Sequence, residues 1–236
     1  MVYEIAGLRV EIKNRCRYTT EFCKEYLSED QTSACDMVAE VTNEEFYEEK
    51  AASPEYSDGY IENICLYRKI CLQMPKFDRF LLHAAVLTVD GDGYAFLGRS
   101  GAGKSTHTGL WLNHVAGAEI LNGDKPILEK RGKEFIAYGT PWMGKEGRGR
   151  KGSAPVKALC FIEKAKENAI SRLSVSELTG RIFSQLLIPT EEEAAEKALE
   201  LCDSFVLSVP AYVLQCDISK TAVKTSFEAM TGKKLQ

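Results

Sequence analysis

The interpretation of this sequence of 236 residues rests on the stretch Gly98-Arg99-Ser100-Gly101-Ala102-Gly103-Lys104-Ser105. They carry glycine, lysine and serine at every defined position of the phosphate-binding pattern G-x-x-x-x-G-K-[ST]. The apolar run Tyr94 to Leu97 precedes them and predicts a strand, and a helix carrying Leu110 and Trp111 is expected to follow. Strand, loop and helix in this order predict a site for the phosphates of a nucleoside triphosphate.

Each part of this loop has a physical role in binding phosphate. Glycines let backbone N–H groups approach phosphate oxygens without a clash from a Cβ atom, and the N-terminus of the next helix attracts negative charge. The amine of Lys104 suits the β- and γ-phosphates, and the hydroxyl of Ser105 suits Mg²⁺. We therefore expect ATP and Mg²⁺ as cofactors. The predicted nucleotide-binding residues are Gly98, Ser100, Gly101, Ala102, Gly103, Lys104, Ser105 and Thr106.

Two side chains outside the loop are candidates for chemistry. Asp124 follows a short predicted strand, and its carboxylate fits either a Mg²⁺ ligand or the base that takes a proton from a hydroxyl group. It equally fits an ordinary turn, because Asn122-Gly123-Asp124-Lys125-Pro126 is a good turn sequence. His83 lies in an apolar run, where a structural histidine is the more common interpretation.

The stretch from Gly139 to Gly152 is predicted as a loop, with five glycines and five charged residues. Its segment Lys145 to Lys151 has two interpretations. One is a solvated flexible loop. The other is a glycine-hinged lid that brings an arginine to the transferred phosphoryl group.

The remaining sequence predicts a mixed α/β fold. Strands are expected at Leu8–Ile12, Met37–Val41 and, as one continuous buried strand, Leu81–Val89. Ala169–Leu173 is expected to pair with the strand at 156–162, and Thr190-x-x-Glu193 is expected to cap a helix. We divide the chain into an N-terminal α/β segment, residues 1–75, of unassigned role, and a nucleotide-binding domain, residues 76–236.

Composition argues against several other classes of protein. Lys and Arg number 30 against 34 Asp and Glu, and the net charge of −4 does not suit a general nucleic-acid binder. No apolar run approaches the 18 residues of a membrane span, and the first residues lack the pattern of a signal peptide. The eight cysteines form no C-x-x-C pair, which argues against a zinc ribbon. We expect a cytoplasmic protein that binds neither nucleic acid nor membrane.

From about Tyr60 onward the sequence resembles the kinase domain of HPr kinase/phosphorylase, in the superfamily of phosphoenolpyruvate carboxykinase. The resemblance rests on His83-Ala84-Ala85-Val86, Gly91-x-Gly93, Gly98-x-Ser100-Gly101-x-Gly103-Lys104-Ser105 and Asn122-Gly123-Asp124. It implies a P-loop domain with a mixed sheet, in which a β-hairpin leads into the loop. The segments 106–108 and 139–145 look closer to a less characterised branch, some of whose members are thought to phosphorylate serine hydroxyls.

The resemblance also implies roles for single residues. Asp124, His83 and Arg148 match catalytic positions, and Ser105, Asp124 and Glu146 match metal-binding positions. The family has an Asp-Asp pair whose first member accepts the proton, and Gly123 stands at that position here.

The leading hypothesis is an ATP- and Mg²⁺-dependent kinase that phosphorylates a hydroxyl group of a peptide, a protein or a small molecule. A non-catalytic ATP-binding sensor or scaffold is the alternative that Gly123 favours. A carboxykinase ranks last, because the chain is short for the substrate domain of that enzyme. Members of the family form oligomers, so self-association of this protein stays an open alternative.

Overall fold

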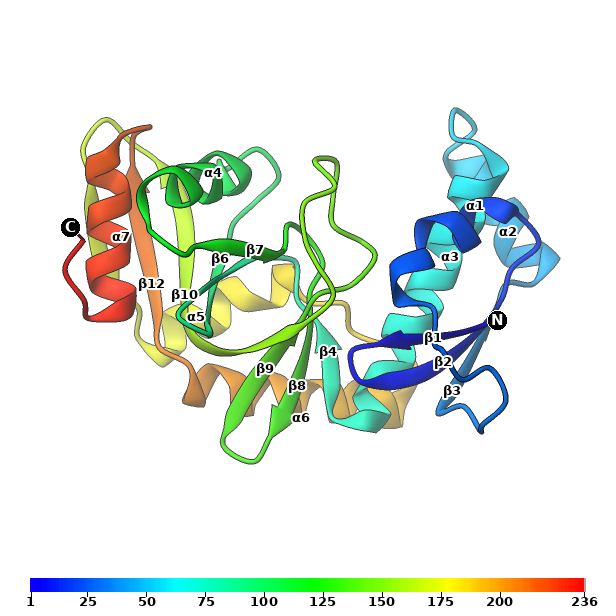
Figure 1. Cartoon of the computed structure of the whole chain (residues 1–236). Coiled ribbons are helices and arrows are strands. Elements are labelled where there is room, and N and C mark those ends of the chain that lie inside the picture. Colours follow the sequence, from blue (N-terminus) through cyan, green and yellow to red (C-terminus); the bar gives the residue numbers. More distant parts are fainter. Residues whose placement is uncertain (236) are drawn as a thin grey trace.

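Two β-sheets organise the chain in the computed structural model, which describes residues 1–235 (Figure 1). The smaller sheet has the order β1-β2-β3. The larger, nine-stranded sheet runs β4-β8-β9-β10-β6-β5-β7, with β12 beside β10 and β11 beside β12. The strands are β1 (Val2–Ile5), β2 (Leu8–Lys13), β3 (Met37–Glu40), β4 (Arg79–Leu81), β5 (Ala85–Val89), β6 (Asp92–Leu97), β7 (Glu119–Asn122), β8 (Ile127–Arg131), β9 (Glu134–Tyr138), β10 (Ser153–Lys164), β11 (Ala169–Arg172) and β12 (Ala211–Cys216). The mixed α/β fold expected from the sequence is confirmed.

Helices cover both faces of the larger sheet and one face of the smaller. They are α1 (Arg17–Phe22), α2 (Asn43–Ala52), α3 (Asp58–Gln73), α4 (Lys104–His114), α5 (Val175–Ile182), α6 (Glu192–Ser208) and α7 (Lys220–Thr231), with short 3-10 helices at Lys24–Tyr26, Met74–Phe77 and Phe183–Gln185. No helix within residues 1–235 is long and apolar enough to cross a membrane.

The side chains of β6 alternate between two hydrophobic cores. Ala95 and Leu97 pack with α5 and α6, in a core that includes Phe205. Tyr94 and Phe96 pack on the opposite face with Trp111 of α4 and with α7. Because both faces are covered, β6 is apolar from Tyr94 to Leu97, as a buried central strand must be. Its C-terminal end is therefore a fixed point from which the loop at 98–105 emerges.

The β-hairpin that leads into this loop is confirmed. β5 pairs antiparallel with β6, and the turn residues Asp90 and Gly91 both have positive φ, 52° and 84°. Asp-Gly is a common sequence at such a turn, because glycine adopts positive φ without steric cost. β6 in turn pairs parallel with β10, and β10 pairs parallel with β12.

The N-terminal segment shares a hydrophobic core with the rest of the chain. Strands are present where Leu8–Ile12 and Met37–Val41 predicted them, as β2 and β3. The buried face of α3 packs on this sheet, and the same core takes in Ile127 and Trp142 of the later sequence. The indole N–H of Trp142 donates to the side-chain oxygen of Asn63 at 2.9 Å. The segment therefore contacts the start of the loop at 139–152.

Leu81–Val89 does not form one continuous strand, contrary to the sequence prediction. β4 ends at Leu81 and β5 begins at Ala85. Between them the backbone N–H of His83 donates to the carbonyl of Gln185 at 2.7 Å, and the N–H of Ala84 donates to the carbonyl of Asp124 at 3.1 Å. The run breaks because its two parts pair with different strands, β4 with β8 and β5 with β6 and β7. The break moves His83 out of the sheet.

Two smaller expectations were also wrong. β11 pairs with β12 and not with β10, because β6 and β12 already occupy both sides of β10 at that level. The N-cap of α6 is Glu191 and not Thr190, and its carboxylate accepts the N–H of Ala194 at 3.1 Å.

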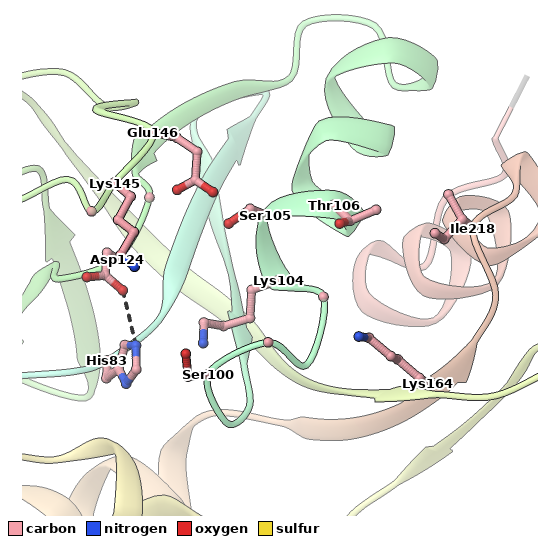
Figure 2. Close-up of a pocket in the computed structure, with 14 residues that line it drawn as sticks. His83, Ser100, Lys104, Ser105, Thr106, Asp124, Lys145, Glu146, Lys164 and Ile218 are labelled. Carbon is pink, nitrogen blue, oxygen red and sulfur yellow. Dashed lines mark ion pairs between the residues drawn. The ribbon is translucent and has the colours of Figure 1, made fainter.

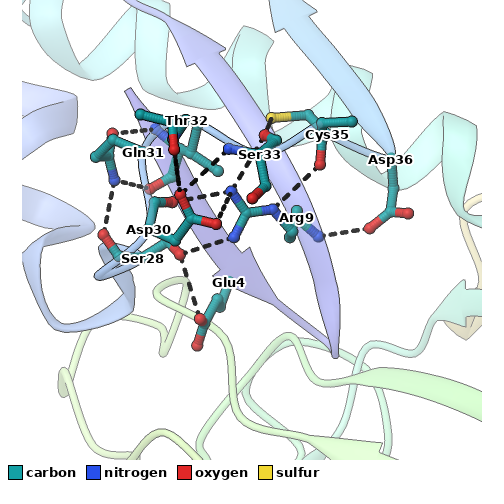
Figure 3. A network of polar contacts seen from close by, with 11 residues as sticks. Glu4, Arg9, Ser28, Asp30, Gln31, Thr32, Ser33, Cys35 and Asp36 are labelled. Atoms are coloured by element: carbon teal, nitrogen blue, oxygen red, sulfur yellow. Dashed lines mark hydrogen bonds and ion pairs between the residues drawn. The ribbon is translucent and has the colours of Figure 1, made fainter.

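A single arginine organises the loop that joins the first 3-10 helix to β3 (Figure 3). The guanidinium of Arg9, on β2, donates to the carbonyls of Asp30, Ser33 and Ala34 at 2.9, 3.2 and 3.1 Å. It also donates to the hydroxyl of Ser28 at 3.2 Å. The planar guanidinium group, with its five N–H donors, thus holds residues 28–34 in place of regular backbone hydrogen bonds between strands.

We predict that Arg9→Lys loosens this loop, because an ammonium group cannot reproduce the fork. Loss of charge-assisted hydrogen bonds of this kind should speed amide exchange at residues 30–36 by about 10-fold. Hydrogen–deuterium exchange measures this. Arg17→Lys is the control, since that guanidinium pairs with Glu21 on an exposed helix face and makes no other ion pair within residues 1–235. Equal protection in both variants would contradict the prediction.

Candidate functional site

The loop at 98–105 joins the C-terminal end of β6 to the first turn of α4. Gly98 and Gly103 have φ angles of 144° and 109°, which residues other than glycine rarely adopt. A Cβ atom at Gly98 would also lie 3.0 Å from the Cβ of Ala102. Lys104 and Ser105 form the N-terminus of α4, so the helix dipole is directed at the enclosed space. This geometry suits an anion.

A cavity of about 520 Å³ opens inside the loop (Figure 2). It contains most of the residues that the sequence predicted. The predicted residues in its wall are His83, Ser100, Gly101, Gly103, Lys104, Ser105, Thr106, Asp124 and Glu146. We call this cavity the phosphate pocket. The structure thus brings together a loop, a histidine and two carboxylates from four separate parts of the chain.

Three predicted residues are not in the wall of this pocket. Gly98 and Ala102 line a neighbouring cleft instead. Arg148 instead lines a small space of about 10 Å³, together with Ser105 and Glu146. Its carbonyl accepts the N–H of Gly123 at 3.0 Å, so its backbone has a structural role in this position. A contact between the Arg148 side chain and phosphate stays a prediction.

Asp124 is held by a hydrogen-bonded turn and directs its carboxylate at a histidine. The buried Asn122 accepts the backbone N–H groups of Asp124 and Lys125 at 2.9 and 2.7 Å. The carboxylate oxygens of Asp124 lie 3.1 Å from His83 Nε2 and 3.0 Å from Lys125 Nζ. Asp124 is therefore a turn residue and a carboxylate of the pocket at the same time, so the two interpretations of its sequence do not exclude each other.

The environment of Asp124 keeps its carboxylate ionised. Burial raises the pKa of Asp124, but the hydrogen bond from His83 and the charge and hydrogen bond of Lys125 together outweigh burial and lower this pKa to about 2. The His83 side chain is 38% exposed, so it is not the structural histidine that an apolar run favours. Both groups are accessible from the phosphate pocket.

Lys104 is a buried cation without a carboxylate partner within hydrogen-bond distance among residues 1–235. Its Nζ donates to the carbonyl of Gly98 at 2.8 Å. Burial lowers the pKa of Lys104, and the negative charge of Asp124 partly opposes this. A desolvated ammonium group attracts an anion more strongly than an exposed one, because water screens it less.

Gly123 lies where backbone segments of the site approach each other too closely to leave room for a side chain. A Cβ atom here would lie 2.8 Å from the carbonyl oxygen of Met143 and 3.0 Å from that of Arg148. The backbone of the loop at 139–152 therefore fills the space of a side chain at this position. A carboxylate does not fit at residue 123 in this structure, and Asp124 is the carboxylate that remains.

Five wall residues of the pocket are not among the predicted site residues. Gly123, Gly144 and Lys145 belong to segments that the sequence analysis discussed, and the other two come from parts of the chain that it did not connect with the site. Lys164 ends β10, and Ile218 follows β12 with 76% of its surface exposed. They reach the site because the carboxyl ends of parallel strands meet at one edge of a sheet. A sequence signal existed only for Lys164, as a cation at the end of an apolar run. Its use required knowing that β10 is parallel to β6.

Comparisons with known proteins show a distant structural likeness and no match to a protein family. No family model matches the sequence, and no curated protein matches it. Among solved structures, the Hpr(Ser) kinase/phosphatase from Coxiella burnetii is similar at 11% identity, with a TM-score of 0.35, over 64% of this chain and 93% of that chain. A TM-score this low marks a distant likeness and carries no argument about activity.

We predict that Gly123→Ala destabilises the protein, because the new methyl group meets backbone atoms that must shift. The free energy of unfolding should fall by about 1–3 kcal/mol, as for other overpacked sites. Urea unfolding measures this. Gly109→Ala is the matched control, since a Cβ atom there meets nothing within 4 Å and alanine favours the helix. Equal stability of the Gly123→Ala variant and the parent would show that the loop does not pack as described.

Proposed function

We propose that this protein is a kinase that transfers the γ-phosphoryl group of ATP, with Mg²⁺, to a hydroxyl group. The observation that carries the proposal is the placement of the ionised Asp124 carboxylate, hydrogen-bonded to His83, in the same pocket as the amine of Lys104 (Figure 2). A phosphate-binding loop alone indicates binding. A carboxylate opposite its lysine adds a group that can align a nucleophile.

The cavities around the loop support one orientation of a bound nucleotide. A largely apolar groove of about 400 Å³ adjoins the phosphate pocket and shares four residues with it: Gly103, Thr106, Lys164 and Ile218. It lies beside α4, where Leu110 and Ile162 form part of its wall. A purine base suits this groove, because base rings bury apolar surface. The γ-phosphate then lies at the other end, beside Ser100, Lys104 and His83.

The oxygen groups of the pocket fit Mg²⁺ bound to a nucleotide. Ser105, Asp124 and Glu146 all line the pocket and offer the oxygen ligands that Mg²⁺ prefers. No cluster of three or more His, Cys, Asp or Glu residues that could hold a metal occurs within residues 1–235. Mg²⁺ in kinases needs only one or two carboxylates beside phosphate and water. When bound, it neutralises charge on the β- and γ-phosphates.

The chemistry assigned to the chain is mostly positioning. The acceptor oxygen forms a bond to the γ-phosphorus, the bond to the β–γ bridging oxygen breaks, ADP leaves, and Asp124 takes the proton of the hydroxyl group. His83 orients the carboxylate, and Lys104 balances the charge on the phosphoryl oxygens. A pKa of about 2 makes Asp124 a weak base but a good acceptor of a hydrogen bond from the hydroxyl group. Bound phosphates would act to raise this pKa and Mg²⁺ would act to lower it, since like charges disfavour the ionised form and opposite charges favour it.

A non-catalytic ATP sensor is the second candidate. One observation favours it: loop backbone fills the space beside Gly123 where the family motif places its first carboxylate. In that case ATP binds in the same pocket and no phosphoryl group is transferred. The two candidates make opposite predictions for turnover and the same prediction for binding.

We predict that Asp124→Asn abolishes transfer and spares binding. Transfer from γ-labelled ATP to seryl peptides, free serine or water should fall by about 100-fold or more, because the amide cannot accept the proton. ATP should still bind, since Lys104, Ser105 and the backbone of the loop at 98–105 are unchanged. The control is Asp203→Asn, at an exposed position on α6.

Unchanged turnover in Asp124→Asn would contradict the assigned role of this carboxylate. ATP binding without any turnover in the parent protein, toward water as well as toward the acceptors, would support the sensor instead.

A further inference from the structure

A second cleft adjoins the phosphate pocket on the side of α5. Its volume is about 1000 Å³, and it shares His83, Ser100, Gly101 and Lys164 with the phosphate pocket. Its far wall is formed by residues 180–185, at the end of α5 and in the following 3-10 helix. Because His83 and the start of the loop belong to both spaces, a molecule in this cleft reaches the proposed position of the γ-phosphate.

Cations predominate in the cleft. Arg99 and Lys164 form no ion pair within residues 1–235, and Arg99 lines the cleft without lining the phosphate pocket. Arg181 pairs with Glu163 at 2.7 Å, at side-chain exposures of 38% and 40%. The guanidinium of Arg181 lies 5.7 Å from the centre of the Phe161 ring, which helps to hold it in place. An exposed pair of this kind contributes little, so an anion can replace Glu163 as its partner.

The far wall of the cleft holds an unsatisfied polar group. Gln185 is 5% exposed, and its side-chain oxygen has no hydrogen-bond partner among the residues that the structure describes. An unpaired buried acceptor is unfavourable. The backbone carbonyl of Gln185 accepts the backbone N–H of His83 at 2.7 Å. The far wall of the cleft is therefore tied directly to the proposed catalytic pair.

On the basis of the proposed function, we propose that this cleft binds the phosphoryl acceptor, and that the acceptor is a small hydroxy acid. Its carboxylate pairs with Arg99 and Arg181, whose planar forks suit carboxylates. Its hydroxyl group lies at His83, where its oxygen attacks the γ-phosphorus, ADP leaves, and the proton passes to Asp124. A singly charged carboxylate suits this place better than a second phosphate, because the nucleotide phosphates repel added negative charge.

The test uses two pairs of probes that differ in the carboxylate alone. L-serine is compared with serinol, and glycerate is compared with glycerol. Transfer from γ-labelled ATP is measured for each, together with a seryl peptide. Binding of glycerate in the presence of Mg²⁺ and a non-hydrolysable ATP analogue is measured separately by saturation-transfer NMR. We expect binding and transfer for the acids and at least about 10-fold less for the partners that lack the carboxylate.

Arg181→Gln is the diagnostic variant. It should raise the KM for the acid about 10-fold and leave ATP affinity, ATP hydrolysis by water and the melting temperature unchanged. Arg172→Gln, an exposed arginine on β11, is the control. A second variant, Ser184→Trp, fills the cleft and should lower transfer to the acid without changing hydrolysis by water.

The outcomes separate this proposal from the kinase itself. ATP hydrolysis without binding of the acids, equal transfer to glycerol and glycerate, or transfer to the peptide alone would each overturn the hydroxy-acid cleft and leave the kinase intact. Glycerate binding that Arg181→Gln weakens, in a protein that transfers no phosphoryl group from ATP to water or to any of the probes, would support the cleft and overturn the kinase.

Discussion

The parallel pairing of β6, β10 and β12 is the constraint on which the site depends. Parallel neighbours place their carboxyl ends at one edge of the sheet, so the loop after Leu97, Lys164 at the end of β10 and Ile218 after β12 converge there. Hydrophobic cores on both faces fix these strands. The phosphate pocket, the apolar groove and the second cleft are three neighbouring spaces along this one edge.

The N-terminal segment has a structural role in this arrangement. Trp142, at the start of the loop 139–152, donates to Asn63 and packs against Tyr67 of α3 with ring centroids 4.6 Å apart. From this anchor the loop returns over Gly123, close enough to exclude a side chain there. Residues 1–75 thus hold one wall of the site, in a core shared with Ile127 of the larger sheet.

The sequence was sufficient for the local features whose chemistry is complete within a few residues. The loop, the β-hairpin and the strand at β2 follow from glycine positions, turn residues and alternation. It was insufficient where a long-range contact decided the outcome. The run from Leu81 to Val89 gave no sign of its break, because the break follows from hydrogen bonds to Gln185 and Asp124, far along the chain. The environment of His83, the space beside Gly123 and the cleft lined by Arg181 all depend on such contacts.

We propose that the loop at 98–105 binds the triphosphate of ATP through the desolvated amine of Lys104. The decisive measurement is calorimetric titration with Mg²⁺ and ATP, comparing the parent protein with Lys104→Ala. The exposed Lys133→Ala, in the turn between β8 and β9, is the control. We expect saturable binding of one ATP per chain that Lys104→Ala abolishes in a folded protein, and that Lys133→Ala leaves unchanged. Equal affinity in all three proteins, or no binding by the parent, would overturn this role of the loop.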